Sequence, residues 1–91
     1  MITLHLPDDL ARELGIAPHS RHAPRQSLGE LLEAVEAVTP GLLPRIMEAD
    51  GRTRRHLNLF VGETRVRRED ARGVPLRDGD EVWLLRAISG G

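Results

Sequence analysis

The chain of 91 residues carries 13 basic and 14 acidic side chains, so its formal net charge at pH 7 is −1. This balance argues against a strongly basic nucleic-acid-binding protein and against an acidic tail protein. Leucine, valine, isoleucine and phenylalanine account for 25 residues, enough for one small domain that buries about 64% of its surface on folding. Cysteine is absent, which excludes a disulfide framework, a zinc–thiolate site and a cysteine nucleophile.

The amino-terminal residues read MITLHLPDD and contain neither a basic segment nor an apolar signal segment. No stretch of the chain approaches the ~18 apolar residues needed to span a bilayer. We therefore expect a cytoplasmic protein that does not associate with a membrane. All 13 basic residues are arginine, a bias that the codon usage of a GC-rich genome explains.

The first third of the chain predicts a strand and a short helix. Residues 2–6 read ITLHL and end at Pro7, which cannot donate to a strand ladder. Residues 8–14 predict a helical turn that places Leu10 and Leu14 on one side and stops at Gly15. Residues 17–26 are polar and interrupted by proline, which is compatible with either a weak strand or a loop.

The strongest periodic signal begins at Ser27, which forms an S-x-x-E capping box with Glu30. Apolar residues then recur at helical spacing and predict one buried stripe, made of Leu28, Leu31, Leu32, Val35 and Val38. Thr39-Pro40-Gly41 ends this helix. Pro44 suits the first turn of a second, short helix that extends to about Ala49, with Leu43, Ile46 and Met47 available to pack.

The last third predicts strands. Residues 57–61 read LNLFV, an alternation that separates Leu57, Leu59 and Val61 from Asn58 and Phe60. Residues 64–66 predict a short strand, and an Asp-Gly turn at 78–79 leads into a last strand, VWLLRAI. One amphipathic helix across one face of a small mixed sheet uses this order of elements economically, so the predicted fold class is α+β with a β-grasp arrangement.

The chain stops at Ser89-Gly90-Gly91 directly after the last predicted strand. Glycine has no Cβ, and residues 88–91 could reach roughly 13 Å at ~3.3 Å per residue. We expect a domain over residues 1–87 and a flexible tail over residues 88–91, thin enough to enter the narrow active site of another protein. Ile88, Ser89 and Gly90 would provide the access, and Gly91 would carry the chemistry.

The sequence resembles the ThiS/MoaD family of ubiquitin-like sulfur carriers. The resemblance is carried by PLRDGDEVWLLRAISGG at residues 75–91 and by LNLFVG at residues 57–62. Within the family, GLLPRIMEADGRTRRHLNLFVGE looks most like the carriers of a route to cysteine that uses O-phosphoserine and a cysteine synthase. Two departures concern partner choice: residues 17–26 are less regular than the family's second strand, and Arg86-Ala87 stands where many members carry proline.

The resemblance implies that an E1-like enzyme uses ATP and Mg²⁺ to adenylate the carboxylate of Gly91, and that a sulfur donor then converts it to a thiocarboxylate. The carrier is not an enzyme and binds no cofactor or metal of its own. A cysteine synthase is the favoured acceptor, and thiazole, molybdopterin or thiosugar synthesis are alternatives. A metalloprotease that releases the product is a further candidate partner, and the free carrier is expected to be a monomer.

The candidate partner interface consists of Phe60, Trp83 and Leu85. Strand alternation places these three side chains on the face of the sheet opposite the main helix if Leu59, Val82 and Leu84 pack inward. The one phenylalanine and the one tryptophan of the chain would then share an exposed apolar patch, a surface typical of partner binding.

Other polar groups have simpler explanations. Arginines at 52–55 and 65–68 are expected to be solvated, because no aromatic residues interleave them and nearby acids interrupt the positive charge. His19 and His22 form a lone H-x-x-H, which does not predict a metal site. Asp78 and Asp80 flank Gly79 in a turn and Glu81 follows directly before the last predicted strand, which accounts for all three carboxylates without acid–base chemistry.

Two alternative functions remain open from the residues. The same tail could form isopeptide bonds with lysines of target proteins, as ubiquitin-like modifiers do. The domain could also be a binding module whose terminus is never activated.

Overall fold

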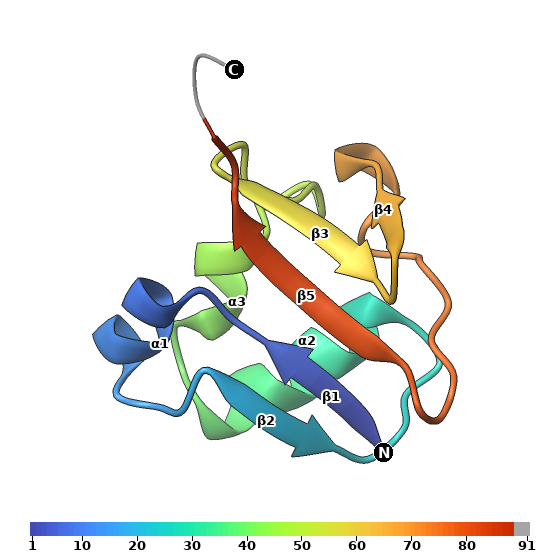
Figure 1. Cartoon of the computed structure of the whole chain (residues 1–91), viewed down its shortest axis with the longest axis horizontal. Coiled ribbons are helices and arrows are strands. Elements are labelled where there is room, and N and C mark those ends of the chain that lie inside the picture. The colour runs from blue at the N-terminus through green and yellow to red at the C-terminus, as the bar shows by residue number, and fades with distance from the viewer. Residues whose placement is uncertain (89–91) are drawn as a thin grey trace.

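A five-stranded mixed sheet forms the frame of the protein, in the order β2-β1-β5-β3-β4 (Figure 1). The strands are β1 (Ile2–His5), β2 (His19–His22), β3 (Leu57–Val61), β4 (Thr64–Val66) and β5 (Glu81–Arg86). The central pair, β1 and β5, is parallel, and the other neighbours are antiparallel. The computed structural model describes residues 1–88.

The helices lie between the strands in sequence. They are α1 (Asp8–Leu14), α2 (Leu28–Val38) and α3 (Leu42–Ile46), and a short 3₁₀ helix, η1 (Arg68–Asp70), follows β4. In Figure 1, α2 crosses behind the sheet and α3 lies beside it. This is the predicted α+β, β-grasp architecture, and in the described part of the chain no helix has the length and apolar character needed to span a membrane.

The core lies between α2 and one face of the sheet. Strand alternation sends Leu4, Leu59 and Leu84 to this inner face, where each is at most 1% exposed. The helix adds Leu28, Leu31 and Leu32, which are completely buried. Side chains alternate between faces every 2 residues in a strand and repeat every 3.6 residues in a helix. These two periods predict which apolar side chains of the sheet and of α2 face one another and become buried.

One member of the predicted helical stripe is not part of the core. Val38 occupies the last position of α2 and is 83% exposed. The helix ends there, before Pro40 and Gly41 turn the chain away, and the Val38 side chain stays uncovered although Val35, one turn earlier, is buried. The periodic pattern correctly predicts which face of α2 is apolar, but it does not show how far along the helix that face is covered.

The amino terminus of α2 is capped as the sequence predicts. Ser27 Oγ accepts a hydrogen bond from the backbone N–H of Glu30 at 3.2 Å. The Glu30 carboxylate in turn accepts from the N–H of Gln26 at 3.1 Å, one residue before the position usual in a capping box. Both bonds satisfy backbone donors that the helix itself leaves unpaired.

Replacing Ser27 with alanine is expected to lower the free energy of unfolding by about 1 kcal/mol, because the Glu30 N–H loses its partner. Urea denaturation followed by circular dichroism measures this change. Ser27→Asp supplies another capping oxygen and should restore most of the stability. An unchanged midpoint for Ser27→Ala would show that the cap does not contribute to stability.

The predicted second helix has different bounds from those expected. It begins at Leu42, two residues before Pro44, and ends at Ile46 rather than near Ala49. Met47 leaves the helix because it forms an isolated β-bridge with Thr53, and its side chain is nevertheless buried as predicted. Pro44 remains in the first turn, where its missing N–H costs no intrahelical hydrogen bond.

The strand bounds also need small corrections. Of the two alternatives for residues 17–26, the structure contains a strand, β2, which pairs with β1 through the register Ile2↔His22 and His5↔His19. The last strand begins at Glu81 and ends at Arg86, two residues before the predicted end. The first strand ends at His5, although Leu6 remains buried.

Glu36 ties the end of α2 to the start of α3. Its carboxylate accepts hydrogen bonds from the backbone N–H groups of Gly41 at 2.9 Å and Leu43 at 2.7 Å. These two bonds hold the pKa of the Glu36 carboxyl below its ordinary value. The carboxylate thus replaces the intrahelical partners that the first turn of α3 lacks.

The Glu36 contacts predict a specific loss of stability in acid. Because the pKa of Glu36 is lower in the folded protein, its contribution is complete above the ordinary carboxyl pKa and is lost as the pH falls through the lowered value. Glu36→Gln should therefore flatten the dependence of the free energy of unfolding on pH below about pH 4.5. Glu33→Gln, on an exposed position of the same helix, is the matched control and should leave the slope unchanged.

Candidate functional site

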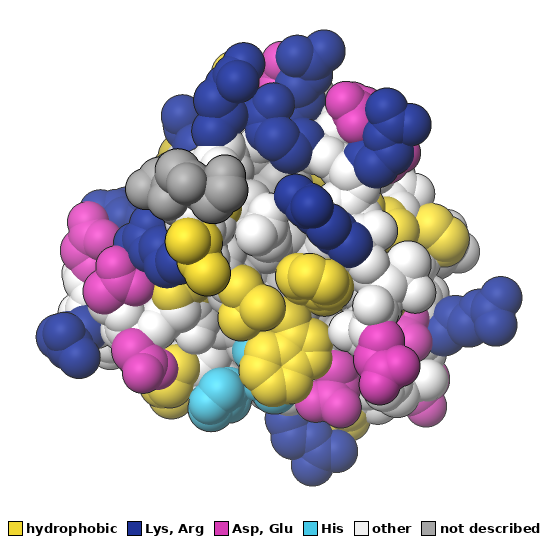
Figure 2. All heavy atoms as spheres, turned by 45° about the horizontal axis from the view of Figure 1, so that its top comes forward, with side chains coloured by type: hydrophobic (Ala, Val, Ile, Leu, Met, Phe, Trp, Pro, Cys, Tyr) yellow, Lys and Arg dark blue, Asp and Glu magenta, His cyan; other side chains and the backbone are white. Residues whose placement is uncertain are grey.

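The three predicted interface residues lie together on the outer face of the sheet, opposite α2. Within β5, Val82 and Leu84 are buried, whereas Trp83 is partly exposed and Leu85 is 44% exposed. Phe60 of β3 pairs directly with Trp83 in the antiparallel register. Figure 2 shows apolar side chains gathered into a patch on this face. Their predicted positions are confirmed; their role in binding a partner stays a prediction.

A row of side chains crosses the outer face through all five strands. The registers pair His19 with His5, His5 with Trp83, Trp83 with Phe60, and Phe60 with Arg65. Directly opposite residues on one face of a sheet are near enough for their side chains to touch. The apolar patch is therefore the middle of a longer row that ends in histidine on one side and arginine on the other.

His5 lies beneath the patch and is only 9% exposed. Its ring stacks on the indole of Trp83, with centroids 3.6 Å apart and an interplanar angle of 12°. Its Nδ1 is 2.7 Å from Nδ1 of His19, and its Nε2 is 2.8 Å from a carboxylate oxygen of Glu81. No sequence motif indicates a role for His5, because only the β1–β5 pairing brings this histidine to the tryptophan.

The two histidines of the H-x-x-H segment point to opposite faces. His19 joins the outer row, whereas His22 contacts Ser20 Oγ at 2.7 Å and faces the helix side opposite Ile2. Partial burial lowers the pKa of His22. Across residues 1–88, no group of three or more histidine, aspartate or glutamate side chains is arranged to hold a metal ion.

The end of β5 is fastened where the tail leaves the sheet. The Arg86 guanidinium donates to both carboxylate oxygens of Asp9, at 3.3 and 3.1 Å from Nε, and this holds the pKa of Asp9 below its ordinary value. The N–H of Ala87 donates to the carbonyl of His56 at 2.9 Å. Ile88 is then 89% exposed, and the proposed Ser89, Gly90 and Gly91 lie outside the described residues.

Arginines are concentrated in one stretch of the chain. Residues 52–68 contain six of the thirteen arginines and only one acidic residue, Glu63. Figure 2 shows basic side chains collected at the top of the view, beyond the apolar patch. Several of them are not simply solvated as predicted, since Arg54 donates to the Pro44 carbonyl, Arg65 to Asn58, and Arg68 to Thr53 and Glu48.

The acidic turn before β5 is structural, as predicted. The Asp80 carboxylate accepts from the N–H of Arg77 at 2.8 Å, and Gly79 adopts φ +93°, which favours glycine. Asp78 pairs with the amino group of Met1, and this contact lowers its pKa. These carboxylates therefore close the turn and anchor the first residue of the chain.

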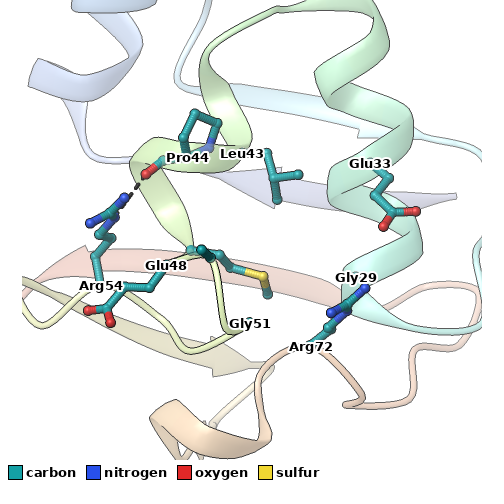
Figure 3. Close-up of a pocket in the computed structure, with 10 residues that line it drawn as sticks. Gly29, Glu33, Leu43, Pro44, Glu48, Gly51, Arg54 and Arg72 are labelled. Atoms are coloured by element: carbon teal, nitrogen blue, oxygen red, sulfur yellow. Dashed lines mark hydrogen bonds between the residues drawn. The ribbon is translucent and has the colours of Figure 1, made fainter.

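A groove of about 330 Å³ lies on the helix side, between α2, α3 and residues 48–51 (Figure 3). Leu43, Pro44 and Met47 line it, together with charged residues that include Glu33 and Arg72. None of its lining residues within the described chain is a serine, threonine, cysteine, histidine or lysine. The only carboxylates that line it within the described chain are those of Glu33 and Glu48.

Comparison with known proteins decides the family. The chain matches the ThiS family over residues 6–91. It belongs to the ThiS family. The ThiS-type chain is 29% identical to the sulfur carrier protein CysO of Mycobacterium tuberculosis strain H37Rv over 92 residues, which covers 99% of this chain and 98% of CysO.

Solved structures agree with this assignment. The crystal structure of Mycobacterium tuberculosis CysO superimposes with a TM-score of 0.83 at 27% identity, covering 97% of this chain and 100% of CysO. A chain of the BexX/CysO complex of Amycolatopsis orientalis has the same fold, with a TM-score of 0.83 at 24% identity and complete coverage of both chains. The protein is a ubiquitin-like carrier of the ThiS type, and its sequence is CysO-like along its whole length.

A second kind of relative is the small archaeal modifier protein 3 of Haloferax volcanii. It is 32% identical over 65 residues, which cover 71% of this chain and 70% of the modifier. Sulfur carriers and protein modifiers thus both occur among the relatives of this ThiS-type chain.

Proposed function

We propose that this chain carries sulfur as a thiocarboxylate on Gly91. The observation that carries the proposal is that the ThiS match extends from residue 6 through Gly91 and so includes the terminal Gly-Gly. The full-length similarity to CysO supports the same chemistry. In this proposal the folded domain is the part that a partner enzyme binds, and the reaction takes place at the carboxylate of Gly91.

The chemistry requires activation by a partner. A carboxylate is a poor electrophile, because its negative charge is shared by two oxygens. An E1-like enzyme would use ATP and Mg²⁺: a Gly91 oxygen attacks the α-phosphorus, and pyrophosphate leaves. Sulfide then attacks the carbonyl carbon of the acyl-adenylate, the bond between that carbon and the AMP oxygen breaks, and AMP leaves, which gives the thiocarboxylate. The partner supplies the positive groups that stabilise phosphoryl charge, and the carrier catalyses no step.

The outer face of the sheet is the proposed docking surface for the activating enzyme. Trp83 and Leu85 lie on β5, whose continuation is the tail, so a partner that grips this face holds the tail at a set distance from its own active site. Phe60 extends the surface onto β3. Large apolar anchors beside a charged rim are typical of protein interfaces.

A cysteine synthase is the favoured acceptor, a choice supported by the similarity to the sulfur carrier CysO over 99% of this chain. The thiocarboxylate sulfur is a soft nucleophile that would attack an electrophilic carbon held in the pocket of that enzyme. Acceptors that form a thiazole, molybdopterin or a thiosugar use the same nucleophile. A metalloprotease would release the product where the sulfur is delivered while still bonded to Gly91.

Intact-mass spectrometry tests the proposal. The purified protein is incubated with the activating enzyme, ATP, Mg²⁺ and a sulfide donor, and a parallel reaction omits ATP. A mass gain equal to the exchange of one oxygen for one sulfur, seen only with ATP, is expected. Absence of this gain with an activating enzyme that loads another carrier would contradict the proposal and favour a binding module.

The second candidate function is protein modification through Gly91, favoured by the similarity to the Haloferax volcanii modifier. It predicts ATP-dependent adducts of higher mass in cells, with Gly91 joined to lysines of other proteins. The chain has no lysine of its own, so such adducts cannot grow into lysine-linked chains of this protein. If such adducts form and no thiocarboxylate is detected, the chain is a protein modifier and not a sulfur carrier.

A further inference from the structure

The histidine pair under Trp83 is the strongest feature of the molecule that the proposed function leaves unused. His5 is held on three sides, by Trp83 against its ring face, by His19 at Nδ1 and by Glu81 at Nε2. His19 also meets the His5 ring edge-on, with centroids 4.8 Å apart. The indole of the docking surface therefore rests on a ring whose two nitrogens are both hydrogen-bonded.

The two hydrogen bonds of His5 restrict where its protons can lie. An ionised carboxylate only accepts, so the Nε2 of His5 must donate to Glu81. In the neutral ring, Nδ1 of His5 is then the acceptor, and Nδ1 of His19 carries the hydrogen between them. Every polar atom in these two contacts is satisfied, with both histidines neutral.

Addition of one proton to the histidine pair leaves both hydrogen bonds of His5 intact. A protonated His5 donates from both nitrogens, to Glu81 and to a His19 that has moved its own hydrogen to Nε2. The imidazolium then lies flat on the indole, 3.6 Å away, where a cation is favourable. A second proton removes the arrangement, because both Nδ1 atoms would carry hydrogens at a separation of 2.7 Å and two like charges would repel.

The charged groups around the pair come from both neighbouring strands. Glu81 approaches from β5. His19 faces His5 from β2, and Arg21, two residues further along the same face of β2, pairs with Thr3 in the next row. Arg21 adds positive charge on the side of His19, and Glu81 adds negative charge on the side of His5.

We propose that His5, fixed by His19 and Glu81, is the residue that positions Trp83 for docking of the activating enzyme, and that double protonation of the histidine pair releases Trp83. This inference rests on the proposed function for its partner. A prearranged indole avoids the cost of immobilising a side chain during binding, which corresponds to roughly 2- to 12-fold in affinity. His5 is a positioning residue, because it acts through Trp83 and is itself covered by it.

The chain offers a direct optical test. Trp83 is its only tryptophan and it has no tyrosine, so intrinsic fluorescence reports on the indole above His5 alone. In the wild type, fluorescence anisotropy should show little local motion of Trp83 at pH 8. Motion should increase as the pH is lowered from 8 toward 5, because protonation of both rings would break the contact between their Nδ1 atoms.

Three variants separate positioning from simple packing. His5→Phe retains a stacked ring without hydrogen bonds, and Trp83 should be mobile and insensitive to pH. His19→Ala changes an exposed position on an edge strand, removes the second proton site, and should remove release in acid. His56→Ala is the control, because His56 is exposed in the loop before β3 and should leave the profile unchanged. Binding to the activating enzyme at pH 8 should weaken about 2- to 12-fold for His5→Phe.

Two results would overturn the inference. The first is wild-type Trp83 fluorescence that does not change between pH 8 and 5, and the second is a His5→Phe profile identical to the wild type. If His5→Phe fails to fold, His19→Ala alone decides. The fluorescence measurements need only the free protein, so they test how Trp83 is positioned independently of the proposed function. A failed thiocarboxylate assay would reject the proposed function without changing the fluorescence result.

Discussion

Deletion of Gly90 and Gly91 is expected to abolish thiocarboxylate formation, with the mass gain of the wild type falling below detection. The proposed reaction forms and breaks bonds only at the carboxylate of the last glycine, and after deletion the carboxylate belongs to Ser89, two residues nearer the domain. A shortened tail that carries a side chain at its end should not place the carboxylate beside the partner's ATP. Intact-mass spectrometry after incubation with the activating enzyme and ATP measures the loss.

Two single substitutions separate the contribution of Gly91 to loading from that of Gly90. Gly91→Ala changes the reacting residue and should abolish loading, whereas Gly90→Ala retains Gly91 and should slow loading, because its new Cβ hinders access to a narrow site. Denaturation in urea should give the same free energy of unfolding for all of these variants. Full loading of the deletion variant would show that Gly91 is not the carrier position.

Replacement of Trp83 by alanine is expected to weaken binding to the activating enzyme by about 30-fold, which corresponds to about 2 kcal/mol. Trp83 is the largest side chain of the apolar patch and lies at the centre of the row between His5 and Phe60. Isothermal titration calorimetry gives the affinity. The domain should remain folded, because the buried core lies on the opposite face of the sheet.

Val38→Ala is the matched control for this prediction. Val38 is also an exposed apolar side chain, at 83%, but it lies at the end of α2 rather than on the outer face of β5. Its removal should leave the affinity unchanged. If Trp83→Ala and Val38→Ala bind equally well, the partner uses another surface, and the arginines of residues 52–68 become the next side chains to substitute.

The elements with a strong local signal were predicted from the sequence. The capping residue Ser27 and the apolar spacing from Leu28 to Val35 specify α2, and alternation specifies which side chains of β3 and β5 face the core. The ends of the helices were predicted less accurately. Met47 left its helix to bridge Thr53, and Val38 stayed uncovered, because both outcomes depend on neighbours distant in the chain.

The site divides in the same way. Phe60, Trp83 and Leu85 could be assigned to one face because side-chain direction in a strand alternates with period 2. His5 could not be assigned to that site, since nothing in the residues from 2 to 6 indicates that β1 pairs in parallel with β5, about 75 positions later. The H-x-x-H spacing was uninformative for a related reason, because its two histidines belong to opposite faces of an edge strand.

The sequence by itself therefore determined the fold class, the face of each strong element and the terminal glycines that carry the proposed chemistry, since these follow from local period and residue type. Only the tertiary structure decided that β1 lies beside β5, that His5 contacts Trp83, His19 and Glu81, and that basic side chains collect beyond the apolar patch. The physical reason is that strand order is set by the burial of the whole inner face at once, which no single segment encodes.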